Sequence, residues 1–146
     1  MQVEIKISGL DEVGRFAEVA TRWASGGMLD VFGEAIIEDA RLRLEDDETD
    51  PDGNRWAEWS DSYAATRGPG DKILFDSGDL SRSLSARRRG SMLSVASSEE
   101  YAAVHQFGSL DGNTPAREFI GVGREFLDVL GEVLPADLDR EFSRGK

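Results

Sequence analysis

The pattern of apolar and polar positions predicts three elements in the first third of the chain. Residues 2–7 alternate between polar and apolar side chains, which is typical of a half-buried strand. Apolar residues then recur at helical spacing over residues 10–23 and again from Met28 to about Leu44. Gly26-Gly27 separates the two helical stretches, so we expect them to pack as a helical hairpin.

The middle of the chain is rich in turn residues. Residues 45–54 (EDDETDPDGN) predict an acidic loop, because Asp-Pro and Asp-Gly both interrupt regular structure. Ser60 is placed to cap a short helix that runs to Arg67, with Tyr63 on its inner face.

Shorter elements are expected in the second half. Residues 80–86 and 92–97 predict a β-hairpin whose tip carries the run Arg87-Arg88-Arg89. Residues 101–107 fit either a third strand or a short helix, residues 108–116 a loop, and residues 117–121 a short strand. Residues 126–142 show the spacing of an amphipathic C-terminal helix.

These elements together indicate the α+β class. We expect an N-terminal helical hairpin, a small, mostly antiparallel β-sheet within residues 73–121, and a C-terminal amphipathic helix packed on one face of the sheet. Neither a long linker nor an internal repeat divides the chain, so residues 1–146 are expected to form a single domain.

Charge and composition narrow the function classes. The chain has 146 residues and a formal net charge of −12. This sign disfavours nonspecific binding to nucleic acid or to an anionic membrane by the surface as a whole. No apolar run approaches the roughly 20 residues needed to cross a bilayer. The absence of cysteine excludes disulfides, thiol nucleophiles and cysteine-based metal sites.

Two metal-site hypotheses follow from the acidic residues. With Gly53 at the sixth position of a calcium loop, Glu48, Asp50 and Asp52 occupy ligand positions, but the twelfth position is Trp59 rather than glutamate. A solvated acidic turn is therefore favoured, although cation binding by residues 45–54 stays open.

The second hypothesis is a hydrolytic or metal site. It would combine His105 with Asp76, Asp79 or Asp111, because histidine titrates near neutral pH. Nothing in their spacing requires these side chains to meet, and a structural histidine is favoured. Neither a cofactor nor a catalytic motif is predicted.

Two further groups have both a structural and a binding interpretation. Trp56, Trp59 and Tyr63 lie at spacings of three and four, so they form either part of the core or an aromatic ligand platform. The arginine run at residues 87–89, with Arg82 nearby, is either a solvated turn or a contact for an acidic surface, including residues 45–54 of a neighbouring copy.

Four segments in a fixed order carry a family resemblance. They are PDGNRWAEWSDSYAATR (residues 51–67), ILFDSGDLSRSL (73–84), YAAVHQFGS (101–109) and NTPAREFIGV (113–122). This order resembles the phage virion morphogenesis family, the tail completion proteins that include the Mu-like protein G, over roughly residues 10–135. One departure is Glu118, where the family often has proline.

The resemblance implies assembly rather than chemistry. It implies a structural protein at the tail end or the head–tail joint, in a tail completion, terminator or neck role, that forms a homo-oligomeric ring. Its expected partners are copies of itself and tail tube, sheath or connector proteins, with DNA passing through the lumen without specific binding. Its expected location is the virion, and the bacterial cytoplasm during assembly. An acidic lumen would repel DNA phosphates and keep the DNA sliding.

The residues of the shared segments are interpreted as scaffold, and other exposed residues as assembly contacts. The scaffold residues are Trp56, Gly78, Leu80, Tyr101, His105, Gln106, Gly108, Pro115, Arg117 and Phe119. The expected assembly contacts are Arg82, Arg87, Arg88, Arg89, Asp111 and Asn113. Within the scaffold, an ion pair between Arg117 and Asp79 is expected. The alternative function is a small acidic binding or inhibitory module that sequesters a basic partner.

Overall fold

A computed structural model of the chain describes residues 3–6, 28–90, 92–124 and 126–128. Within these residues, three antiparallel strands form a sheet in the order β1-β3-β2. The strands are β1 (Val3–Lys6), β2 (Leu84–Arg89) and β3 (Met92–Ser97). The helices are α2 (Met28–Leu42), the π-helical turn η2 (Arg43–Asp47), α3 (Asp61–Ala64), α4 (Asp79–Arg82) and α5 (Ala102–Phe107).

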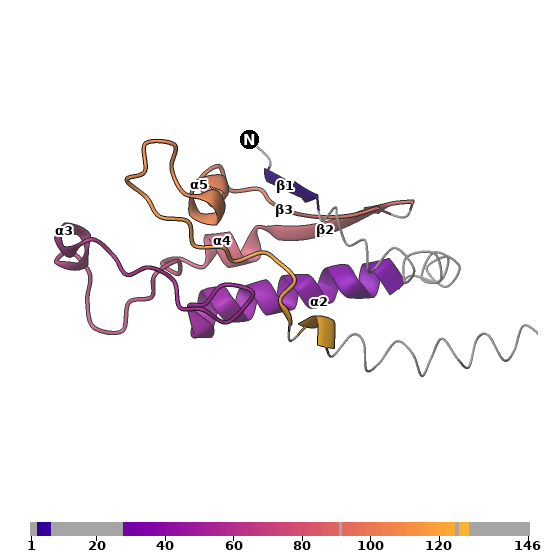
Figure 1. Cartoon of the computed structure of the whole chain (residues 1–146), viewed down its shortest axis with the longest axis horizontal. Helices are drawn as coiled ribbons and strands as arrows, with labels where there is room; N and C mark the ends of the chain where they lie inside the picture. Colours follow the sequence, from indigo (N-terminus) through magenta and orange to yellow (C-terminus); the bar gives the residue numbers. More distant parts are fainter. Residues whose placement is uncertain (1–2, 7–27, 91, 125, 129–146) are drawn as a thin grey trace, which may run out of the picture.

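The long helix α2 packs along one face of β2 and β3 (Figure 1). Its buried face meets the inward-facing side chains of the two strands, which are set by the period-two alternation of strand residues. The core residues of this layer are Ile36, Ile37, Ala40, Leu44, Leu84 and Val95. The helix approaches the sheet closely at Gly33, where a Cβ atom would lie 2.7 Å from the Cβ of Ala86. A glycine at this position therefore lets the helix approach the sheet.

The C-terminal end of α2 continues directly into the π-helical turn η2. Arg43 in this turn is buried, forms an ion pair with Asp39, and donates a hydrogen bond from Nη1 to the carbonyl oxygen of Phe119 at 3.3 Å. Glu48 then adopts a left-handed conformation with φ of 53°, which ends the turn. The acidic stretch therefore begins inside the helix rather than after it.

Most of the predicted elements are present, and the α+β class is confirmed. The strand over residues 2–7 and the helix from Met28 are found close to their predicted positions. The choice left open for residues 101–107 resolves to the helix α5. The helix predicted over residues 10–23, and with it the helical hairpin, lies outside the described residues, as does most of the C-terminal helix.

Two strand predictions are wrong. Residues 80–83 do not begin the hairpin, because Gly78, in a left-handed conformation with φ of 81°, starts the short helix α4 instead. As a consequence the arginine run lies within β2, and the hairpin turns at Gly90 (φ of 58°).

Residues 117–121 also form no strand. The segment lies beside α5 rather than at a sheet edge, and the Gln106 side chain supplies the hydrogen bonds that a neighbouring strand would otherwise provide.

Candidate functional site

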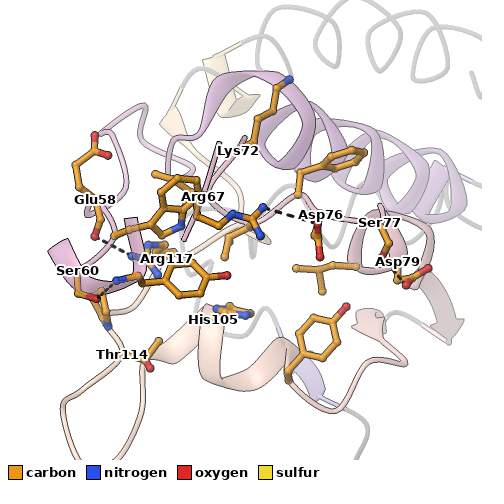
Figure 2. A pocket seen from close by; sticks show the side chains of 18 of the residues that line it. Glu58, Ser60, Arg67, Lys72, Asp76, Ser77, Asp79, His105, Thr114 and Arg117 are labelled. Atoms are coloured by element: carbon orange, nitrogen blue, oxygen red, sulfur yellow. Dashed lines mark hydrogen bonds and ion pairs between the residues drawn. The ribbon is translucent and has the colours of Figure 1, made fainter. Parts of the chain in front are cut away.

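The segments with the family resemblance meet around one cleft of about 880 Å³ (Figure 2). Its walls come from residues 58–67 around α3, from residues 72–80 leading into α4, from α5, and from residues 113–117. These segments are far apart in the sequence, and no regular sheet joins them. Side-chain contacts between these segments hold the cleft together.

One wall consists of aromatic side chains and an arginine. The rings of Trp59 and Tyr63 pack edge-to-face with their centroids 5.8 Å apart. The Arg67 guanidinium lies over both rings, at 5.4 Å from Trp59 and 5.8 Å from Tyr63. Arg67 also forms ion pairs with Asp71 at 3.2 Å and with Asp76 at 3.7 Å, so its charge is balanced. Figure 2 shows the pair with Asp76.

Trp56, Trp59 and Tyr63, the three aromatic residues of the first segment, do not form a common platform. Trp56 is buried in the core, where its Nε1 donates a hydrogen bond to the carbonyl oxygen of Glu118 at 2.9 Å. Ser60 caps α3, as predicted, by accepting a hydrogen bond from the backbone N–H of Tyr63. The Tyr63 side chain is 49% exposed, so its placement on an inner face is wrong. Four residues of helix are too few to bury one face.

Arg117 joins the first and fourth segments, residues 51–67 and 113–122. Its side chain is buried, and it donates hydrogen bonds from Nε to the carbonyl oxygen of Ala57 at 2.8 Å and from Nη2 to that of Glu58 at 3.0 Å. Burial lowers the pKa of Arg117, although the guanidinium stays charged at physiological pH.

The predicted ion pair between Arg117 and Asp79 is wrong. Asp79 instead pairs with Arg82, its neighbour three residues along α4, at 2.6 Å. Hydrogen bonds from Ser77 and Arg82 lower the pKa of Asp79. Residues three apart in a helix meet readily, so this local partner takes the carboxylate.

His105 lies half-buried on the cleft wall. Its ring packs edge-to-face against the Tyr101 ring, with the two centroids 5.8 Å apart. Its Nδ1 is buried and has no hydrogen-bond partner among the described residues. Burial, followed by the nearby charge of Arg117, lowers the pKa of His105. The imidazole is therefore neutral at pH 7.

The hypothetical hydrolytic site is only partly assembled. Asp76, Asp79 and His105 line the same cleft, but Asp76 is paired with Arg67 and Asp79 with Arg82. Asp111 does not line the cleft. In the described part of the chain, no three histidine, aspartate or glutamate side chains are grouped as metal ligands would be.

The acidic loop uses its carboxylates to hold its own backbone. Asp50 accepts hydrogen bonds at 2.9 Å from the backbone N–H groups of both Asp52 and Asn54. Burial alone would raise the pKa of Asp50, but the hydrogen bonds from Asn54 and Asp52 outweigh it and lower the pKa. Glu48 accepts a hydrogen bond from the backbone N–H of Ile73 at 2.6 Å. These bonds resemble those of a closed turn more than those of an open cation site.

Two glycines of the last segment are required by close packing. A Cβ at Gly121 would lie 2.5 Å from Cγ of Pro51, and a Cβ at Gly123 would overlap the Pro51 carbonyl oxygen. The turn at Pro51 therefore rests directly on the segment that follows Phe119. Together with Trp56 and Arg117, this contact holds residues 51–59 against residues 117–123.

The remaining scaffold residues differ in exposure. Leu80, Gln106 and Phe119 are buried, whereas Tyr101 and Pro115 are exposed. Gly108 ends α5 with a φ of 80°, and a Cβ there would lie 3.0 Å from the backbone of residues 114 and 116.

The expected assembly contacts lie in two separate places. The arginines at positions 82 and 87–89 lie on α4 and β2, and all four are exposed. Asp111 and Asn113 lie in the loop after α5, where Asp111 accepts a hydrogen bond from the backbone N–H of Asn113 at 3.0 Å. A hydrogen bond between the backbone N–H of Ser109 and the carbonyl oxygen of Thr114, at 2.9 Å, closes this loop.

An exposed apolar stripe was not predicted. It consists of Tyr101, Val104, Phe107 and Leu110, which follow one another at intervals of three residues along α5 and into the loop. Their exposed fractions are 43%, 39%, 62% and 110%. The signal was present in the sequence YAAVHQFGSL, because apolar residues occupy positions on more than one side of so short a helix. Exposed apolar stripes of this kind often mark contact sites.

Comparisons with known proteins point to phage assembly. The model of the phage virion morphogenesis family matches residues 14–139. The putative capsid assembly protein G of Escherichia phage Mu is 36% identical to this chain over 97 residues, and the match covers 58% of each chain. No solved structure matches. Among the described residues, no helix has the length and apolar character needed to cross a membrane.

Proposed function

Because the chain belongs to the phage virion morphogenesis family, and so has a role in phage assembly, we propose that it is a non-enzymatic structural protein of the tail end or the head–tail joint. The supporting observation is that the polar side chains of the motif segments hold the fold together, while apolar side chains of the same segments are exposed. Trp56, Gln106 and Arg117 are engaged with backbone groups, while the apolar stripe beside them is open to solvent.

The engaged side chains support a structural interpretation of the motifs. A catalytic group must be free to meet a substrate, whereas Gln106 and Arg117 hydrogen-bond to backbone atoms that lie 13 to 60 residues away. The cleft carboxylates Asp76 and Asp79 are paired with arginines. These motif residues thus maintain a fold whose surface is presented to other proteins.

The apolar stripe is the proposed contact surface for a neighbouring virion protein. Leu110 projects from a loop whose backbone is already fixed by the bonds of Ser109 and Asp111. A pre-organised loop loses little conformational entropy on binding, so an exposed leucine at its tip is well suited to anchor a partner. Tail tube, sheath or connector proteins are the proposed partners.

In the assembled particle the chain is proposed to act as a homo-oligomeric ring. A ring is the closed form of a repeated contact between identical subunits, and it allows DNA to pass through its centre. The net charge of −12 supports passage without binding, because an acidic lumen repels phosphates.

Complementation of a phage that lacks this chain tests the proposal. We expect particles with heads and tails that fail to join, or tails of faulty length, and rescue by the intact chain. Phe107→Asp with Leu110→Asp should abolish rescue while leaving the purified protein folded, because both side chains are exposed. His105→Ala should still rescue, since it removes no contact surface.

Two outcomes would contradict this proposal. Loss of rescue by a folded His105→Ala variant would favour a catalytic site in the cleft. Normal particles without the chain, together with its capture of a basic host or phage protein, would favour the alternative of an acidic inhibitory module.

A further inference from the structure

Among the described residues, the arginines of β2 lie near the N-terminal end of α2, and the acidic residues of η2 follow its C-terminal end. The tip of the β2–β3 hairpin lies at the N-terminal end of α2, where Arg88 Nε is 3.3 Å from Asp30 Oδ1. The acidic residues that begin in η2 lie at the other end, where Ser81 Oγ donates a hydrogen bond to Glu45 Oε1 at 2.7 Å. At 1.5 Å per residue, α2 separates the two ends by about 22 Å, more than twice the screening length of about 8 Å at physiological salt. The two charged ends therefore do not neutralise each other within one molecule.

The basic end has two arginines that remain available. Strand residues alternate between faces, so Arg88 shares the α2-facing side with Leu84 and is held by Asp30. Arg87 and Arg89 lie on the opposite face, are exposed, and form no ion pair with a described residue. In the described sheet β2 is also an edge strand, and such a strand offers unpaired backbone groups to a neighbour.

The acidic end is not fully compensated. We call Asp46, Asp47, Asp50 and Asp52 the acidic turn. Lys72 Nζ approaches Asp46 at 3.2 Å, but no described cation forms an ion pair with Asp47 or Asp52. The negative charges of the acidic turn also act on Glu118. The pKa of Glu118 is raised by burial and then by repulsion from the charges of Asp50 and Asp52. A cation from outside the molecule would relieve it.

We infer that the basic edge strand of one copy docks on the acidic turn of the next, with Arg87 and Arg89 facing Asp47 and Asp52. The occupant is a second copy, because the chain carries both complementary surfaces at opposite ends. A contact between two different surfaces is head-to-tail and repeats, so it gives a ring when the rotation closes. The inference rests on the proposed ring and specifies the surfaces that build it. It also explains how a chain of net charge −12 can associate with itself, since opposite charges meet locally.

Mixing two charge-reversed variants tests this pairing. The first variant is Arg87→Glu with Arg89→Glu, and the second is Asp47→Lys with Asp52→Lys. Each alone places like charges in the contact. In the mixture, the acidic strand of the first variant can meet the basic turn of the second variant. The unchanged arginines of the second variant can likewise meet the unchanged aspartates of the first. Glu99→Lys with Glu100→Lys is the control, because it changes net charge as the second variant does but outside both surfaces. Sedimentation velocity at low salt, up to about 1 mM protein, measures association.

We expect the wild type and the control to associate, and added salt to weaken this association. Each variant alone should associate at least about tenfold more weakly, and the mixture should recover. The second variant is the most informative, because it lowers the overall negative charge and would associate more strongly if only net charge mattered.

Three results would overturn the inference. Undiminished association of both variants would place the contact elsewhere and leave the ring intact. Loss without recovery in the mixture would show that these residues do not face each other. A wild type that stays monomeric up to 1 mM would overturn the self-contact itself, while the particle phenotype described above would still test the structural role.

Discussion

Gln106 is predicted to be the most important polar side chain of the motif segments. It is buried on α5, where its Oε1 accepts hydrogen bonds from the backbone N–H groups of Phe119 and Ile120, both at 3.1 Å. Its Nε2 donates to the carbonyl oxygen of Ile120 at 2.9 Å. Gln106→Leu keeps a similar volume but leaves all three backbone groups without a partner in the interior.

The expected cost follows from that count. An unsatisfied buried polar group costs about 1–3 kcal/mol, and the added apolar burial of leucine offsets part of the sum. We expect a net loss of about 3–4 kcal/mol in the free energy of unfolding. For a chain of this size that lowers Tm by roughly 10–15 °C. Urea denaturation followed by tryptophan fluorescence measures the loss, because Trp56 lies in the affected core.

Two further variants test the same reasoning. Val104→Leu lies on the exposed side of the same helix and should change stability by less than about 0.5 kcal/mol. Gln106→Glu keeps the acceptor but loses the donor when ionised, so its deficit should shrink as pH falls and the carboxyl becomes protonated. A Gln106→Leu protein as stable as the wild type would refute the role assigned to this side chain.

Three other substitutions are expected to have measurable effects. Gly33→Ala should destabilise by about 1–3 kcal/mol in thermal denaturation despite alanine's better helix propensity, because the new methyl would meet Ala86; a more stable variant would contradict this close packing. Trp56→Phe should cost about 1–3 kcal/mol in urea denaturation, since the Glu118 carbonyl loses its donor; an unchanged midpoint would show that water replaces it. The lowered pKa of His105 means that the unfolded chain takes up a proton first, so the His105 contribution to stability is lost as pH falls below about 6.5. His105→Gln should therefore flatten the pH dependence of the unfolding free energy between about pH 7.5 and 5, and an unchanged slope would contradict the pKa direction.

The regular elements could be predicted because local periodicity reports burial. The alternation in residues 2–7 and the helical spacing after Met28 both reflect one buried face, and both elements are found. The segment after Pro115 is also apolar, yet its backbone hydrogen-bonds to the Gln106 side chain and not to a neighbouring strand. Periodicity shows that Phe119 is buried, but it does not show which group satisfies its backbone.

The side-chain contacts of the cleft and the positions of the charged surfaces could not be predicted without the three-dimensional fold. The scaffold interpretation of the motifs expected an ion pair between Arg117 and Asp79, whereas the partners of Arg117 are the carbonyl oxygens of residues 57 and 58. The arginine run and the acidic stretch were visible as charges, and a contact between copies was a reasonable hypothesis. Only the length and direction of α2 show that the arginine run and the acidic stretch lie at opposite ends of this helix (Figure 1).

The copy number of this chain in purified virions tests the central claim most directly. Quantitative mass spectrometry of particles, calibrated against the major capsid protein, gives the number of copies per virion. A structural protein that closes a ring at the tail end or the joint should be present at a fixed value of six or more. Absence from purified particles, or fewer than one copy per particle, would contradict the account.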